Sequence, residues 1–154
     1  MKYFSKELWG ELNSIDQKKR ASAETKWKEN LIRYSAEFER VKPLLPSGFL
    51  KEYLSNNGFH DYLILSISIV FSSHVVKLLL SNGYTKGIVE LSGVNKYSVR
   101  CCGLENCICG NLSWGYSEFN VDHSGRITLS ILCDIDNELF FECASIKYVS
   151  GDGS

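Results

Sequence analysis

The 154-residue chain is short of several features that would point directly to a class of protein. It has two prolines, at positions 43 and 46, and three histidines. Three histidines are too few for the metal-dependent phosphohydrolases, which use an adjacent His-Asp pair together with further histidine ligands. The net charge is −1, so the whole molecule has no strong field that would attract nucleic acid or a membrane surface.

Long apolar runs are also missing. The most apolar stretch, residues 62–80, is interrupted by Ser66, Ser68 and Lys77, among others, whereas a transmembrane helix needs about twenty apolar residues without interruption. Met1 is not followed by the apolar segment of a secretory signal. We therefore expect a cytoplasmic protein that does not enter the membrane. In that reducing compartment its six cysteines should be thiols rather than disulfides.

Catalytic signatures are absent as well. The sequence has no Walker loop, no G-x-S-x-G nucleophile elbow and no G-x-G-x-x-G dinucleotide fingerprint. On this basis we assign no catalytic residue, no cofactor and no direct nucleic-acid contact, and we expect a protein that is not an enzyme.

Residues 62–80 carry the strongest structural pattern in the chain. From Leu63 to Phe71 every second residue is apolar, which predicts a strand with one buried face. Ser72-Ser73-His74 breaks the alternation, and a second apolar stretch continues to Leu80. The pattern predicts a buried β-hairpin.

The segment before the hairpin is charged and predicts helices. Ser5 is a typical N-cap residue and predicts a short helix over about residues 5–13. Residues 15–42 predict a longer amphipathic helix, ended by Pro43, which disfavours helical geometry in the residue before it. Its apolar stripe consists of Trp27, Leu31, Tyr34, Phe38 and Val41.

The segment after the hairpin predicts further short strands. The candidates are residues 84–91, 97–102, 112–121, 126–133 and 139–149. Connections this short cannot hold crossover helices, so the strands should be antiparallel. We predict a single domain over residues 1–154, helical at 1–58 and sheet at 59–150. The fold class is α+β, with N-terminal helices packed on an antiparallel β-sheet of about six strands.

A group of cysteines raises the alternative of a small zinc-binding metalloprotein. The group consists of Cys101, Cys102, Cys107 and Cys109. Three of these thiolates would need a fourth ligand to form a tetrahedral zinc site, from Cys133, Cys143 or His123. The spacing does not match the paired C-x2-C knuckles of zinc ribbons and fingers. We therefore favour thiols that fill a turn and a strand, with no bound metal.

His60 and Asp61 raise a second alternative, an uncharacterised hydrolase that uses them as base and orienting group. Adjacent residues on an extended chain point to opposite faces, so this pair should not form a hydrogen bond. We favour a structural role, with Asp61 capping a turn and His60 packing at the edge of the sheet.

The second half of the chain is acidic. Residues 59–154 hold 6 Lys/Arg against 10 Asp/Glu, and four of the carboxylates flank one predicted turn: Asp134, Asp136, Glu138 and Glu142. Four neighbouring carboxylates cannot all be buried unpaired. We expect them to face solvent and to form a binding surface for a basic partner protein. The loop matches a calcium-binding loop only faintly.

The N-terminal 60 residues resemble a bacterial family of unknown function. The likeness lies in the opening Met-Lys-Tyr-Phe-Ser-Lys-Glu-Leu-Trp, the spaced aromatics of the long helix, and the Leu-Leu-Pro and Phe-His-Asp runs. Such a family implies no activity and no site residues. In size, class and local acidity the chain is also similar to immunity proteins of bacterial toxin systems. This likeness implies a non-enzymatic binding protein whose partner is a basic protein such as a toxin nuclease.

Overall fold

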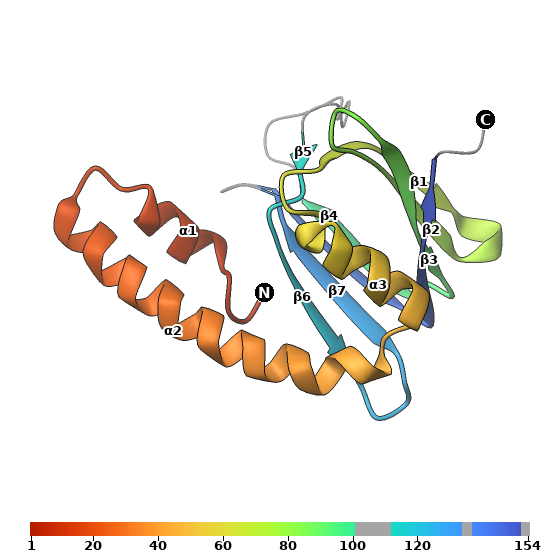
Figure 1. Cartoon of the computed structure of the whole chain (residues 1–154), viewed down its shortest axis with the longest axis horizontal. Coiled ribbons are helices and arrows are strands. Elements are labelled where there is room, and N and C mark those ends of the chain that lie inside the picture. The colour runs from red at the N-terminus through yellow and green to blue at the C-terminus, as the bar shows by residue number, and fades with distance from the viewer. Residues whose placement is uncertain (101–111, 134–136, 152–154) are drawn as a thin grey trace.

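The computed structural model describes residues 1–100, 112–133 and 137–151. It has an α+β fold, as predicted, with helices in the N-terminal part and antiparallel strands after them (Figure 1). The helices are α1 (Lys6–Leu12), α2 (Gln17–Val41) and α3 (Ser47–Ser55), with 3-10 turns η1 (Lys42–Leu44), η2 (Asn57–Phe59) and η3 (Phe71–Ser73). The strands are β1 (Leu63–Val70), β2 (Val75–Ser81), β3 (Lys86–Ser92), β4 (Lys96–Arg100), β5 (Leu112–Ser113), β6 (Tyr116–Val121), β7 (Ile127–Leu132), β8 (Glu138–Cys143) and β9 (Ser145–Ser150).

Short polar side chains start the first two helices. Ser5 Oγ accepts a hydrogen bond from the backbone N–H of Leu8 at 3.3 Å, and the carboxylate of Asp16 accepts one from the N–H of Lys18 at 2.9 Å. These caps satisfy N–H groups that the first helical turn leaves unpaired. The predicted helices over 5–13 and 15–42 are therefore confirmed, together with the Ser5 cap.

The stripe predicted for α2 faces the rest of the protein, with one exception. Trp27 and Val41 are buried and Tyr34 and Phe38 are half-buried, whereas Leu31 is 43 % exposed. The packing partners of α2 are α1 along its first half and β6 along its second half (Figure 1). Leu31 lies at the border of the stripe that these two elements cover.

The predicted hairpin is formed by β1 and β2, which pair antiparallel around η3. The register places Ile67 opposite Leu78, on the core side. A β-bulge between Ile64 and Ser66 inserts one extra residue. The bulge buries Ile64 completely and leaves Leu63 39 % exposed, whereas simple alternation places Leu63 on the core side. One extra residue is enough to exchange the two faces of a strand.

The strands form two sheets rather than one continuous sheet. The five-stranded sheet has the order β5-β1-β2-β3-β9, and the four-stranded sheet has the order β4-β8-β7-β6. The chain passes directly from one sheet to the other at three corners: between β3 and β4, between β5 and β6, and between β8 and β9. Strands that switch sheets at bends are typical of packed sheets with strongly different strand directions.

Backbone hydrogen bonding continues through these corners. The N–H of Ala144 donates to the carbonyl of Ser92 at 2.9 Å, and the N–H of Asn95 donates to the carbonyl of Glu142 at 3.1 Å. The β3–β9 and β4–β8 ladders are therefore one bent ribbon. The described residues form nine strands in two antiparallel sheets, whereas the sequence predicted one sheet of about six strands.

One large hydrophobic core lies between the two sheets and α3. Its fully buried members include Phe49 of α3, Phe59, Trp114, Leu129 and Phe141. A second, aromatic cluster lies outside it, where α1 and the first half of α2 meet the segment that contains Phe4. No helix in the described part of the chain is long and apolar enough to cross a membrane.

Candidate binding surface

The predicted acidic surface is partly engaged within the chain. Asp134 and Asp136 lie outside the described residues. Glu138 forms an ion pair with the terminal amino group of Met1 at 3.0 Å. Glu142 accepts hydrogen bonds from Asn95 at 2.8 Å and from Arg126 at 3.1 Å.

Glu138 and Glu142 therefore already have partners within the chain, although the side chain of each remains about one quarter exposed. The hydrogen bond from Asn95 is the main cause that lowers the pKa of Glu142, followed by Arg126. These pairings neutralise part of the charge that the sequence places around this hairpin.

The four cysteines of the predicted group, Cys101, Cys102, Cys107 and Cys109, lie outside the described residues. Cys133 and Cys143 are buried and are not in disulfides. Burial raises the pKa of the Cys143 thiol to about 11, so it is protonated and a poor nucleophile at neutral pH. Among the described residues, no group of three or more His, Cys, Asp or Glu side chains is placed to hold a metal ion.

The side chains of His60 and Asp61 approach each other, so the premise that they point to opposite faces of an extended chain was wrong. His60 Nδ1 lies 3.0 Å from Asp61 Oδ2. The prediction assumed an extended chain, but Asp61 has a positive φ of 68°. Two residues just before it also have positive φ: Asn57 at 51° and Phe59 at 59°. Positive φ brings the two side chains to the same side. Non-glycine residues in this region are strained and must be held by their surroundings.

The surroundings of this strained turn are well defined. The N–H of Asp61 donates to the carbonyl of Trp114 at 2.8 Å, and the N–H of Trp114 donates to the carbonyl of Tyr62 at 2.7 Å. The ring of His60 meets the ring of Tyr116 edge to face, with centroids 5.2 Å apart. Asp61 itself is 84 % exposed. The pair thus lies on the surface, over the corner between β5 and β6.

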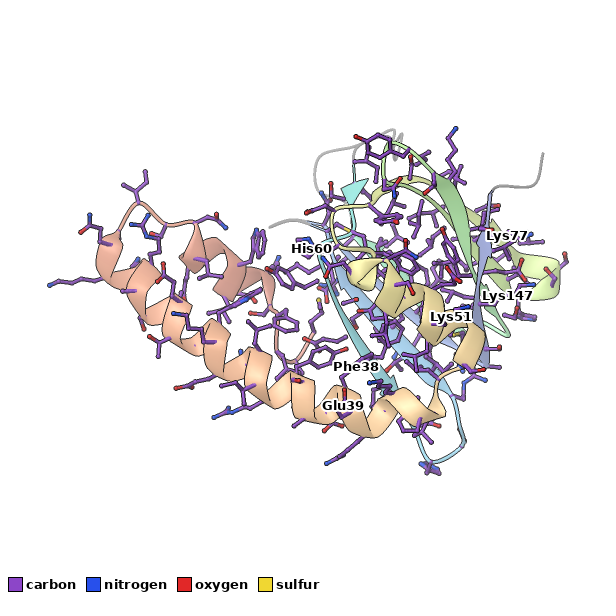
Figure 2. The ribbon with its side chains drawn as sticks, viewed as in Figure 1. Phe38, Glu39, Lys51, His60, Lys77 and Lys147 are labelled. Carbon is purple, nitrogen blue, oxygen red and sulfur yellow. The ribbon has the colours of Figure 1, made fainter. Side chains whose placement is uncertain are left out.

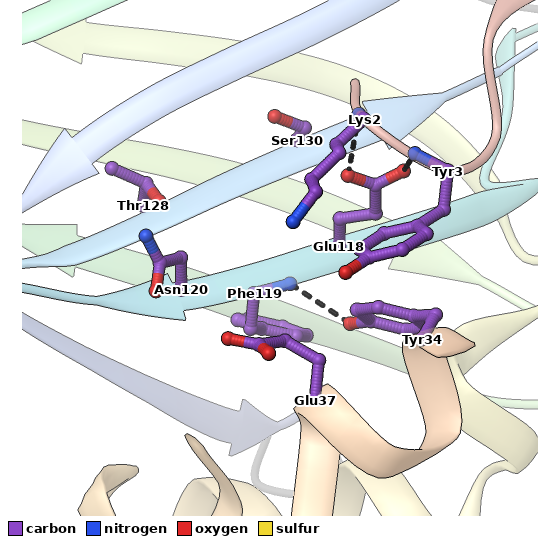
Figure 3. Close-up of a pocket in the computed structure, with 9 residues that line it drawn as sticks. All are labelled: Lys2, Tyr3, Tyr34, Glu37, Glu118, Phe119, Asn120, Thr128 and Ser130. Carbon is purple, nitrogen blue, oxygen red and sulfur yellow. Dashed lines mark hydrogen bonds between the residues drawn. The ribbon is translucent and has the colours of Figure 1, made fainter. Parts of the chain in front are cut away.

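A polar cavity lies between α2 and the outer face of the four-stranded sheet (Figure 3). Its volume is about 160 Å³. Glu118 of β6 occupies its wall and accepts backbone N–H groups from Lys2 at 2.8 Å, Tyr3 at 2.7 Å and Phe4 at 2.8 Å. Tyr34 accepts the N–H of Phe119 at 2.9 Å. Both carboxylate oxygens of Glu118 already accept hydrogen bonds from the N-terminal segment. We therefore interpret this cavity as the place where that segment is anchored on β6, and not as a ligand site.

An apolar groove lies where the tip of the β1–β2 hairpin meets β4. Its volume is about 300 Å³, and its lining includes Val70, Phe71, Val94 and Tyr97. Phe71 is 71 % exposed, and its ring centroid lies 6.5 Å from that of Tyr97. Single exposed apolar side chains are common on protein surfaces, but an exposed apolar patch beside a groove is typical of a contact site.

Local backbone geometry positions this groove. His74 ends η3 with a φ of 52°, in the left-handed region, and this directs the chain into β2. The carbonyl of His74 then accepts the N–H of Val94 at 2.9 Å, which ties the hairpin tip to the corner before β4. The sequence placed a turn at Ser72-Ser73-His74, but nothing in it placed that turn beside residues 94–97.

The rim of the groove reaches one of the predicted acidic residues. Asn95 lines the groove and donates to Glu142. Next to it, the ammonium of Lys96 lies 5.7 Å from the centre of the Phe140 ring. The structure therefore brings an apolar centre and a charged rim together at this end of the β4–β8 pair.

No protein-family model matches this chain, and no curated protein matches it in sequence.

Proposed function

We propose that this protein is a non-enzymatic protein-binding module that acts as an immunity protein and neutralises a bacterial toxin. The observation that supports this proposal best is the apolar groove beside Phe71, which is 71 % exposed. Protein interfaces combine a desolvated apolar centre with a polar rim, and aromatic anchors carry much of their affinity. In this assignment Phe71 and Tyr97 form the centre of the contact.

The acidic residues have a second role in the proposal. Glu142 lies at the rim of the groove, through Asn95, while Glu138 begins β8 at its other end; Asp134 and Asp136 lie outside the described residues. Charges around an apolar centre raise the rate of association more than the final affinity. A basic partner, such as a nuclease whose cleft binds phosphate, would be steered toward this side of the molecule and then held at the groove.

Co-expression with the product of the adjacent gene tests this role. We expect the wild-type chain to restore growth of cells that produce the toxin, and Phe71→Asp to lose this protection because a carboxylate cannot be buried at an apolar contact. Ile15→Asp is the matched control, since Ile15 is 99 % exposed and lies between α1 and α2. Protection that persists in both Phe71→Asp and Tyr97→Asp would contradict the groove as the contact.

Binding kinetics test the acidic residues separately. Asp134→Lys and Glu138→Lys should slow association at low salt, and added salt should reduce the difference, because exposed charges are screened within about 10 Å near physiological ionic strength. If both reversals leave the association rate unchanged at low salt, these carboxylates have no steering role.

A hydrolase is the second candidate, because His60 Nδ1 lies 3.0 Å from Asp61 Oδ2 on a strained and exposed turn. A base with an orienting carboxylate is the arrangement that general-base hydrolysis uses, and strained backbone is frequent at functional sites. The test is turnover of simple ester and phosphoester substrates by the wild type and by His60→Ala. Equal rates in both proteins would eliminate this candidate.

A further inference from the structure

A small apolar patch lies on the outer, otherwise polar face of α2. A shallow groove there is lined by Leu31, Ile32, Ser35, Ala36 and Glu39. Ile32 is 72 % exposed and Leu31 is 43 % exposed. None of the described elements covers this face: the packing partners of α2 contact the opposite side, on which Phe38 lies toward the sheets (Figure 2).

We infer that this face binds a second copy of the chain, with the two α2 helices antiparallel and the two-fold axis level with positions 33 and 34. With that axis, Leu31 of one copy faces Ala36 of the other, and Ile32 faces Ser35. Each large side chain then meets a small one, so that the two faces interdigitate. A two-fold axis forms each contact twice, because the same patch is used on both copies.

Charge fixes the direction of the pair. Lys28 and Glu39 flank the apolar residues on the same helical face and are both exposed. In the antiparallel arrangement Lys28 of each copy meets Glu39 of the other. A parallel arrangement would place Lys28 against Lys28 and Glu39 against Glu39, which is repulsive. Glu39 also pairs with Lys42 of its own chain at 3.2 Å, but an exposed pair of this kind is weak and is easily exchanged.

The size of the patch sets the strength of the dimer. The residues spaced along this face at intervals of four and three are Ala21, Thr25, Lys28, Ile32, Ser35 and Glu39. Ile32 is the one large apolar residue among them, so the seam does not extend into a long coiled coil. The contact is small compared with stable interfaces, which bury about 1,200 Å² or more. We therefore expect weak, reversible association that is seen only at high protein concentration.

Analytical ultracentrifugation of the full chain over a range of concentrations tests the inference. We expect a monomer–dimer equilibrium in the wild type and an association constant at least about tenfold lower in Ile32→Asp. Lys28→Glu should weaken the dimer in the same way, because it creates two repulsive pairs. The double variant Lys28→Glu/Glu39→Lys restores opposite charges across the axis and should restore dimerisation.

Lys51→Glu, an exposed charge reversal on α3, is the matched control and should leave the equilibrium unchanged. All the substituted side chains are exposed, so circular dichroism should show native spectra for every variant. A wild type that stays monomeric at millimolar concentration overturns the inference. So does a double variant that dimerises no better than Lys28→Glu.

Discussion

Glu118 joins segments that are far apart in the sequence, because its carboxylate accepts three backbone N–H groups from Lys2, Tyr3 and Phe4, up to 116 positions away. Hydrogen bonds to a charged acceptor are each worth about 1.5–3 kcal/mol, and removal of the acceptor leaves the donors unpaired. We expect Glu118→Ala to lower the free energy of unfolding by about 2–3 kcal/mol, measured by urea denaturation.

Glu37→Ala is the control for this prediction. Glu37 lines the same cavity but forms an ion pair with the exposed Arg40, so its removal should cost less than about 0.5 kcal/mol. Similar losses in the two variants would show that Glu118 does not anchor the N-terminal segment.

A buried thiol and two buried phenol groups make the stability of the fold sensitive to high pH. Burial raises the pKa of Cys143 from 9.0 to about 11, and burial also raises the pKa values of Tyr34 and Tyr53 above their usual value. A pKa that is higher in the folded state stabilises the protein below the unfolded-state value, and this contribution is lost as the pH rises through the folded-state value. We expect stability to fall between about pH 9 and pH 11, and Cys143→Ala to show a shallower decline in urea denaturation. An identical pH profile in that variant would contradict the assignment.

Single residues were predictable where their partners are local. The Ser5 cap depends on a residue three positions away, and the sequence shows it. Glu118 depends on backbone groups more than a hundred positions away, and no local pattern marks it. The geometry of His60 and Asp61 was predicted wrongly because positive φ at Asp61 is imposed by contacts with Trp114, which lies in a distant segment.

The corner between β3 and β4 depends on one glycine. Gly93 has a φ of 62°, and a Cβ added to it would lie 2.8 Å from the Cβ of Ala144 at the neighbouring corner. Gly93→Ala should therefore lower stability through backbone strain and through this clash, together by about 2–4 kcal/mol in thermal or urea unfolding.

Gly125→Ala is a matched control, because Gly125 has a φ of 80° and nothing within 4 Å of the added Cβ. It isolates the backbone strain, which should cost about 1–2 kcal/mol. The additional loss in Gly93→Ala should disappear when Ala144 is changed to glycine in the same chain. If Gly93→Ala and Gly125→Ala cost the same in every background, the corner does not depend on this close contact.

At the level of elements, helices and strands were predictable because their periodicity is local. The helices over 5–13 and 15–42 and the hairpin at 62–80 are present as predicted. The corner between β3 and β4 coincides with the predicted break between residues 84–91 and 97–102, but the other two corners were not predictable. Ala144 and the Trp114-Gly115 pair interrupt the stretches 139–149 and 112–121 without the usual turn chemistry, and the bends arise only because the two sheets pack against each other.

The described residues form two hydrophobic clusters that differ in size. The main core joins both sheets and α3, whereas Phe4, Leu8, Ala23 and Trp27 form a smaller cluster with the first two helices. Regions with fewer buried contacts open at lower free energy than the core. We expect the amides of α1 and of the first half of α2 to exchange with solvent faster than those of β7, as measured by native-state hydrogen exchange.

Two substitutions separate the clusters. Ile131→Val, in the main core, should accelerate exchange in β7 and leave α1 and the first half of α2 nearly unchanged, because their amides exchange through an opening in which the main core stays intact. Trp27→Ala should accelerate exchange in both regions, because the contacts of Trp27 in the small cluster are lost in the local opening and in global unfolding alike. Equal acceleration of α1 and β7 by Ile131→Val would show that the molecule unfolds as one unit.

The fold class was predictable at the scale of the whole molecule, and the arrangement of the strands was not. Short connections between Leu112 and Ser150 establish antiparallel strands, so the α+β class follows from the sequence. Which strands pair is decided by long-range packing, such as β1 with β5 and β3 with β9. The candidate groove shares this origin, because it joins Phe71 to Tyr97 across two sheets, and no periodic pattern connects them.

The anchoring of the first residues on Glu118 has a consequence for how the chain folds as it leaves the ribosome. Translation proceeds from the N-terminus at about 5–20 residues per second. Phe4 and Trp27 emerge long before Glu118, and β3 emerges long before its partner β9. Until those partners arrive, the aromatic residues and an unpaired strand edge stay exposed to chaperones and to other nascent chains. Such non-local pairing also slows folding, so this protein should complete its fold only after nearly all of it has been synthesised.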